Sequence, residues 1–202
     1  MKRCLLIVLV ATLLTGQRSQ LEETIQNLPE GGTFTDPKTG VTLTMHRKGA
    51  GSRDATGWYA ATSLQPCGFH VIMPGPYNDF TQTGRATDGA MVKIHTVAAR
   101  TPEGATFTVT CTERSDGKIS RSLAEDLVNG LRSTNPDLRQ RKVMLAGADC
   151  VEYSMHTSQS GGMGRIAVIG TRAYLLIIEY PRSVDEYIPD VAKLFFESFE
   201  RR

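Results

Sequence analysis

Four histidines are the first candidates for chemistry in this chain, because imidazole titrates near neutral pH and binds metals. They stand at His46, His70, His95 and His156. None has the His-x-His or His-Glu-x-x-His spacing that presents two imidazoles to one metal. We therefore predict no metal site and no cofactor, and we interpret the histidines as polar residues on the faces of a sheet.

One alternative brings three polar residues together. Strand alternation places His95 with Lys93, and His156 with Glu152 and Ser154, on the less apolar faces of their strands. If those faces meet, His95, Glu152 and His156 would line the polar cleft of a hydrolase-type enzyme. The sequence contains no Gly-x-Ser-x-Gly elbow to support that chemistry.

The glycine-rich stretch from Ser158 to Gly164 superficially suggests a phosphate-binding loop. It lacks the lysine of a P-loop, and it joins two predicted strands instead of leading into a helix whose N-terminus could hold phosphate. We interpret it as a flexible hairpin loop.

The segment from Pro74 to Gly89 is the strongest candidate for recognition of a partner. It is long and polar, yet it carries Tyr77, Phe80 and Arg85. Aromatic and arginine side chains are enriched among the residues that dominate binding energy. We expect these three to be binding residues on an exposed loop. For the segment itself we favour the other interpretation, in which Phe80 packs into the core and the segment forms a short edge strand with residues 79–83 extended.

The N-terminus has the pattern of a secretion signal. Met1-Lys2-Arg3 is basic, and the stretch from Cys4 to Leu14 is almost wholly apolar before polarity returns at Gln17. A membrane helix needs about 20 apolar residues, so we predict a cleaved signal peptide over residues 1–20. The mature protein is then periplasmic or secreted and has no stable membrane span. Without cleavage, the segment would be a weak anchor.

The charge balance argues against nucleic acid as a partner. The 202 residues include 23 Lys+Arg and 21 Asp+Glu, and removal of Lys2 and Arg3 leaves 21 of each. Affinity for nucleic acid depends on clustered basic residues that neutralise phosphates. We interpret the basic runs at residues 139–142 and 201–202 as solvated segments.

The cysteines permit at most one internal disulfide once Cys4 leaves with the signal peptide. Cys67, Cys111 and Cys150 remain, so one thiol stays free. Alternation puts Cys111 on the same face as Val109, and Cys150 on the face opposite Val151. We therefore expect Cys111 and Cys150 to lie on different faces of the sheet, with no bond between them.

Hydrophobic periodicity predicts strands, a helix, more strands and a final helix. Period-two alternation and apolar runs predict strands at about residues 40–45, 58–64, 68–73, 90–100, 105–113, 142–146, 149–156, 164–169 and 173–180. Helical spacing predicts one helix that starts at Ser122 with a capping box to Glu125, and another over residues 185–200. Tyr174 to Ile178 is apolar on both faces, which is typical of a central strand covered on both sides.

Short connections between these strands predict a mostly antiparallel sheet, and the two amphipathic helices must bury their apolar faces against it. The fold class is therefore α+β. Residues 21–57 are predicted to form an N-terminal extension with a short hairpin, and residues 58–202 the main domain.

Three stretches resemble a known family, the one that contains the PsbP extrinsic subunit of photosystem II and a Ran-binding nuclear import factor. They are residues 68–75, residues 144–153, and residues 165–176 together with 195–199. The likeness covers about residues 60–199. It implies an α/β/α sandwich that serves as a binding or accessory module without catalysis. The matching motifs are core strands and turns, so no functional residue is carried over.

We therefore expect an extracytoplasmic, non-enzymatic binding or accessory module whose partner is a protein of the cell envelope. A hydrolase built on His95, Glu152 and His156 is the first alternative. A structural protein of the cell envelope that acts through its N-terminal extension is the second.

Export can be tested directly. N-terminal sequencing of the protein purified from its native host is expected to start between about Gln17 and Leu21, because signal peptides are removed after the apolar region. Soluble cytoplasmic protein that retains Met1 would contradict the prediction.

Overall fold

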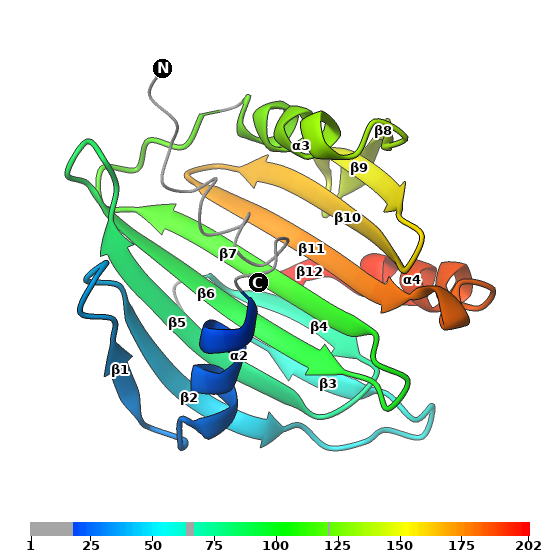
Figure 1. The fold of residues 1–202 in the computed structure, drawn as a ribbon, viewed down its shortest axis with the longest axis horizontal. Coiled ribbons are helices and arrows are strands. Elements are labelled where there is room, and N and C mark those ends of the chain that lie inside the picture. The colour runs from blue at the N-terminus through cyan, green and yellow to red at the C-terminus, as the bar shows by residue number, and fades with distance from the viewer. Residues whose placement is uncertain (1–17, 64–66, 121) are drawn as a thin grey trace.

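The computed structural model describes residues 18–63, 67–120 and 122–202 (Figure 1). The predicted signal peptide, residues 1–20, lies almost wholly outside these ranges. Residues 64–66, between the two strands predicted on either side of Pro66, also lie outside them. Of the helices that the described residues form, none has both the length and the apolar character needed to cross a membrane.

A nine-stranded antiparallel sheet forms the framework of the protein. Its strands, in spatial order, are β1 (Thr33–Thr35), β2 (Thr42–Ala50), β5 (Tyr77–Arg85), β6 (Met91–Arg100), β7 (Thr106–Arg114), β11 (Arg172–Pro181), β10 (Ser160–Ile169), β9 (Ala148–His156) and β8 (Arg139–Leu145). The predicted antiparallel sheet is confirmed. The hairpin predicted in the N-terminal extension is β1 with β2, and it continues this same sheet beside β5.

Tight turns join neighbouring strands, as the sequence predicts. Gly170 and Thr171 alone connect β10 to β11. Gly170 has φ of 64°, in the left-handed region that glycine adopts at little cost. This turn aligns Ile169 opposite Arg172 and fixes the register along the whole hairpin.

Within the described residues, a second, three-stranded sheet and three helices cover the large sheet. The small sheet contains β3 (Tyr59–Thr62), β4 (Phe69–Met73) and β12 (Glu200–Arg201); the helices are α2 (Arg18–Asn27), α3 (Leu123–Thr134) and α4 (Ile188–Glu197), the last preceded by the short 3-10 helix η1 (Arg182–Val184). Figure 1 shows α2 and α3 in front of the large sheet, and α4 with the small sheet behind it. The described residues thus form an α+β fold.

The main core lies between the large sheet and the layer formed by α4 and the small sheet. Phe107 on β7 and Phe195 on α4 meet edge to face, with ring centroids 5.3 Å apart. Leu176 and Ile178 on β11 are fully buried beside them. Each such side chain contributes about 1.5–3 kcal/mol of transfer free energy on burial, so this layer anchors the C-terminal helix.

A second core covers the opposite face, where α3 packs on β9, β10 and β11. Leu175 and Ile177 point to this side, so the central strand β11 is covered on both faces, as predicted. The predicted helix starts at Leu123. The predicted capping box is wrong: Ser122 is in helical conformation, and its hydroxyl donates to the Asp126 carboxylate instead of capping the helix.

Part of the glycine-rich stretch belongs to strand β10, so the predicted flexible loop is wrong for residues 160–164. A Cβ at Gly161 would lie 2.3 Å from the ring of Tyr180, and a Cβ at Gly164 would lie 2.7 Å from the ring of Tyr153. The glycines allow two tyrosine rings of neighbouring strands to lie across β10, one on each face of the sheet. Close packing of aromatic rings is the reason for glycine here.

Substitution of Gly164 tests this packing. Gly164→Ala is expected to lower the free energy of unfolding by about 1–3 kcal/mol, because the added methyl group collides with the buried Tyr153 ring. Urea unfolding at neutral pH measures the change.

Gly130 provides a matched control. It lies on the exposed side of α3 with no atom within 4 Å of an added Cβ. Gly130→Ala is therefore expected to raise the free energy of unfolding by about 0.5–1 kcal/mol through helix propensity. A Gly164→Ala protein as stable as the wild type would contradict the proposed role of the glycine.

Candidate functional site

Three adjacent strands bring five polar side chains onto one face of the large sheet. His46 and Arg47 come from β2, Asp79 and Thr81 from β5, and His95 from β6. In the strand register Thr81 lies opposite His95, and Asp79 lies opposite Arg47. The pairing of β2 shifts between Met45 and Arg47. Such a bulge redirects side chains, and both His46 and Arg47 contact the residues of β5. We call these five residues the Asp79 cluster.

Asp79 is the centre of the cluster. Its side chain has no solvent exposure, and both of its carboxylate oxygens are used. Oδ1 lies 2.5 Å from His95 Nε2, and Oδ2 accepts from Arg47 Nε at 2.8 Å and from Arg47 Nη2 at 2.5 Å. Burial alone would raise the pKa of Asp79, but the hydrogen bonds and charges of His95 and Arg47 outweigh it and lower the pKa.

A second pair stands beside this centre. His46 Nε2 and Thr81 Oγ1 are 2.7 Å apart, and the rings of His46 and His95 meet edge to face at 5.9 Å. Burial lowers the pKa of His46, although the Asp79 carboxylate opposes the shift. The neutral form of His46 is therefore the one that fits this site.

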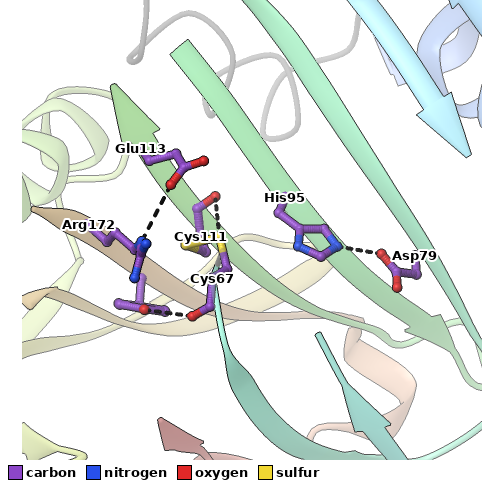
Figure 2. Close-up of a disulfide and its surroundings, with 7 residues drawn as sticks. Cys67, Asp79, His95, Cys111, Glu113 and Arg172 are labelled. Atoms are coloured by element: carbon purple, nitrogen blue, oxygen red, sulfur yellow. Dashed lines mark hydrogen bonds and ion pairs between the residues drawn. A yellow bond between two sulfur atoms is a disulfide. The ribbon is translucent and has the colours of Figure 1, made fainter. Parts of the chain in front are cut away.

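The small sheet closes over the cluster and is bonded to it. Arg47 Nη2 donates to the Thr62 carbonyl at the end of β3, at 2.6 Å. A disulfide joins Cys67, just before β4, to Cys111 on β7, with Cα atoms 6.0 Å apart. Figure 2 shows this disulfide on the strand next to His95, and Cys111 is the register partner of His95. Both the covalent bond and the arginine therefore hold the small sheet in place.

The arrangement contains one element of acid–base chemistry, an aspartate that orients a histidine. However, the His95 side chain is only 4% exposed. The nearest hydroxyl of the cluster, that of Thr81, is bonded to His46 instead. Within the described ranges, no group of three or more His, Cys, Asp and Glu side chains is placed to hold a metal ion. Within the Asp79 cluster, Asp79 is thus bonded to His95 and Arg47, and His46 is bonded separately to Thr81.

The alternative cleft of His95, Glu152 and His156 is not formed. His95 is on β6, and the other two are on β9, with β7, β11 and β10 in between. At about 4.8 Å per strand the separation is roughly 19 Å. Glu152 accepts from Arg141 and Arg165 at 2.6 and 2.8 Å. His156, at the far end of β9, accepts at Nδ1 from Arg182 Nη1 at 2.9 Å. His95, Glu152 and His156 therefore each belong to a separate group of bonded side chains, and they do not line one cleft.

Tyr77, Phe80 and Arg85 lie on strand β5, so the expectation that they stand on an exposed loop is wrong. The edge-strand alternative is right about Phe80, which is buried, but β5 is an interior strand between β2 and β6. Tyr77 faces the main core and Phe80 faces α2. Only Arg85 is exposed, so the three residues do not form one contact surface. The Tyr77 ring instead supports Arg47, whose Cζ lies 5.4 Å from the ring centroid.

The prediction that Cys111 and Cys150 do not pair is confirmed, since Cys111 bonds Cys67 and Cys150 is free. The reason given was wrong. Register aligns Cys111, Tyr174, Ala167 and Cys150 in one row, so both cysteines face the main core. Apolar residues occupy both faces of these strands, and alternation therefore does not identify a common side. Burial raises the pKa of Cys150 to about 11, which makes this thiol unreactive.

Sequence reasoning missed Asp79 and Arg47, the two charged residues of the cluster. One pattern could have indicated Asp79: Asp79 and Thr81 flank the apolar Phe80, as on the polar face of a strand.

The chain matches no family in a scan of protein families, and it matches no curated protein and no solved structure. The function proposed below therefore rests on the residues and geometry of the protein itself.

The pKa of His46 generates a prediction about stability. Because its folded-state pKa is below the ordinary value of about 6.5, His46 stabilises the fold above that pH, and the contribution is lost as pH falls through the folded-state pKa. The lowered pKa of Asp79 acts in the same direction at more acidic pH, below about 4. Urea unfolding as a function of pH is expected to show the first loss below neutral pH.

His46→Gln is expected to remove that first loss, because glutamine keeps a hydrogen-bonding group near Thr81 but does not titrate. His156→Gln, which removes a histidine outside the cluster, serves as the control and should retain it. An unchanged pH profile for His46→Gln would show that the cluster does not control this transition.

Proposed function

We propose that the protein is an exported, non-enzymatic binding or accessory domain that acts outside the cytoplasm, with a protein partner in the cell envelope. Its compartment is supported by the Cys67–Cys111 disulfide, whose two residues are 2% and 0% exposed in the main core. Stable buried disulfides are typical of oxidising compartments and rare in the cytosol. The basic and apolar N-terminal sequence supports the same compartment.

The observation that carries the non-enzymatic part is the burial of the Asp79–His95 pair. Both oxygens of Asp79 are occupied, and His95 is covered by the small sheet with the Phe69 ring centroid 6.3 Å away. A general base must lie within hydrogen-bonding distance of the substrate proton that it removes. Here Nε2 of His95 is bonded to Asp79 instead. We infer that the cluster serves to hold β2, β5, β6 and the small sheet together.

We also propose the PsbP-like relationship as the assignment of the fold. It is supported by the antiparallel sheet with helices on both faces and by the sequence likeness of residues 68–75 and 144–153. Proteins with one fold perform unrelated functions, so this assignment favours a binding or accessory role and leaves the partner to experiment.

A hydrolase is the second candidate, and one observation favours it: the 2.5 Å contact of Asp79 with His95 is the pair that would orient a catalytic base. The two candidates differ in what His95 does. In a binding domain it holds a buried carboxylate by a hydrogen bond, and in a hydrolase it moves a proton.

His95→Asn distinguishes them. For the binding domain we expect a loss of about 1–3 kcal/mol in the free energy of unfolding, since Asp79 loses its hydrogen bond to His95 but keeps Arg47. The folded fraction of the variant, measured by circular dichroism, should still capture the envelope protein that the wild type captures from the native envelope fraction.

Two results would reject the proposal. One is a wild-type protein that cleaves ester or amide substrates, with activity lost and thermal stability retained in His95→Asn. The other is native-host protein whose Cys67 and Cys111 are alkylated without reduction, because reduced thiols at these positions would place the protein in a reducing compartment.

A further inference from the structure

The two edges of the large sheet differ in length and charge. β1 is only three residues long, whereas β8 is seven residues long and pairs with β9 over its whole length. β8 is the terminal strand of the described sheet. The side of β8 away from β9 therefore presents backbone N–H and C=O groups that another extended segment can pair with.

The exposed part of β8 is basic. Arg139, Gln140, Arg141 and Lys142 are all exposed, and the strand contains no acidic residue. Arg141 is bonded to Glu152 but keeps 71% of its side chain exposed. No ion pair within the described chain involves Arg139 or Lys142. The whole chain carries only two excess positive charges, so this concentration is local.

These charges select among possible partners. A second copy of β8, laid antiparallel so that Arg139 faces Lys142, would place cations opposite each other, which is destabilising across a strand pair. An extended segment with acidic residues at alternate positions places opposite charges there instead. Toward its C-terminal end the exposed surface of β8 becomes apolar, since Met144 is 58% exposed. The complementary segment is therefore acidic over most of its length, with an apolar residue near one end.

We propose that β8 is the docking edge for an extended acidic segment of the partner protein, which adds to the large sheet as a further strand. Backbone pairing supplies affinity, and Arg139, Arg141 and Lys142 supply selectivity. This inference rests on the proposed binding function and names the class of partner. The Asp79 cluster lies toward the opposite edge, on β2, β5 and β6, so it takes no part in the contact.

A defined peptide tests the inference with the full mature protein. The probe is a fluorescein-labelled, seven-residue peptide of alternating glutamate and valine, with its ends blocked, to match the length of β8. Fluorescence anisotropy should show saturable binding, and hydrogen exchange should show added protection of amides in residues 139–145. The same peptide with lysine in place of glutamate should bind at least about tenfold more weakly.

Two controls separate strand addition from general charge attraction. N-methylation of alternate amides in the acidic peptide keeps its charge and blocks the backbone ladder, so it should weaken binding at least about tenfold. Arg139→Glu with Lys142→Glu should weaken binding by a similar factor. Lys38→Glu with Lys193→Glu makes the same charge change at two exposed sites on other elements and should leave binding nearly unchanged.

Equal binding of the N-methylated peptide, or equal weakening by the two protein variants, would overturn the inference. Because the peptide measurements use wild-type protein, they decide the matter even if the β8 variant unfolds. The outcome is also separable from the proposed function. Capture of an envelope protein that Arg139→Glu with Lys142→Glu leaves intact rejects the β8 edge alone, and the absence of any capture by the wild type rejects the binding function.

Discussion

The pairing of β7 with β11 is the interaction on which the rest of the structure depends. It joins Thr106–Glu113 to Arg172–Glu179 and so fuses two sets of hairpins into one sheet. Bringing such distant segments together costs loop-closure entropy before other contacts compensate for it. Both cores then need the same strand, because alternate residues of β11 contact α4 on one face and α3 on the other. The two helices are thereby attached to a single central strand.

The Asp79 cluster adds a constraint of a different kind. A buried carboxylate is tolerated only when it is paired and hydrogen-bonded, and the partners of Asp79 come from the strands on either side of β5. A slip of one residue in β5 would turn Asp79 toward α2, whose contacts there are apolar, namely Leu43, Met45 and Phe80. The polar network therefore specifies the register of strands whose hydrophobic pattern alone is weak.

Strands with local alternation, the two main helices and the antiparallel fold class were predictable from the sequence, because those patterns lie within short windows. The errors at β5 and β10 have one cause. The polar residues of β5 and the glycines of β10 are typical of loops when only their neighbours in the sequence are considered. Their cross-strand neighbours explain them: Asp79 is hydrogen-bonded to His95, and Gly164 leaves room for the Tyr153 ring. The same limit explains the site. His95 was identified, but its partner depends on strand register, which residue types alone do not determine.

The disulfide has a mechanical consequence for a chain that is pulled from its two ends. Cys67 and Cys111 are 44 residues apart, and the bond closes β4, β5 and β6 into a covalent ring. A force that pulls the two ends of the chain is transmitted through the sulfur atoms and bypasses that ring. About 150 Å of extended chain, at roughly 3.4 Å per residue, is thus withheld from stretching. The part of the protein that holds the Asp79–His95 pair would remain looped while the segments outside it lengthened.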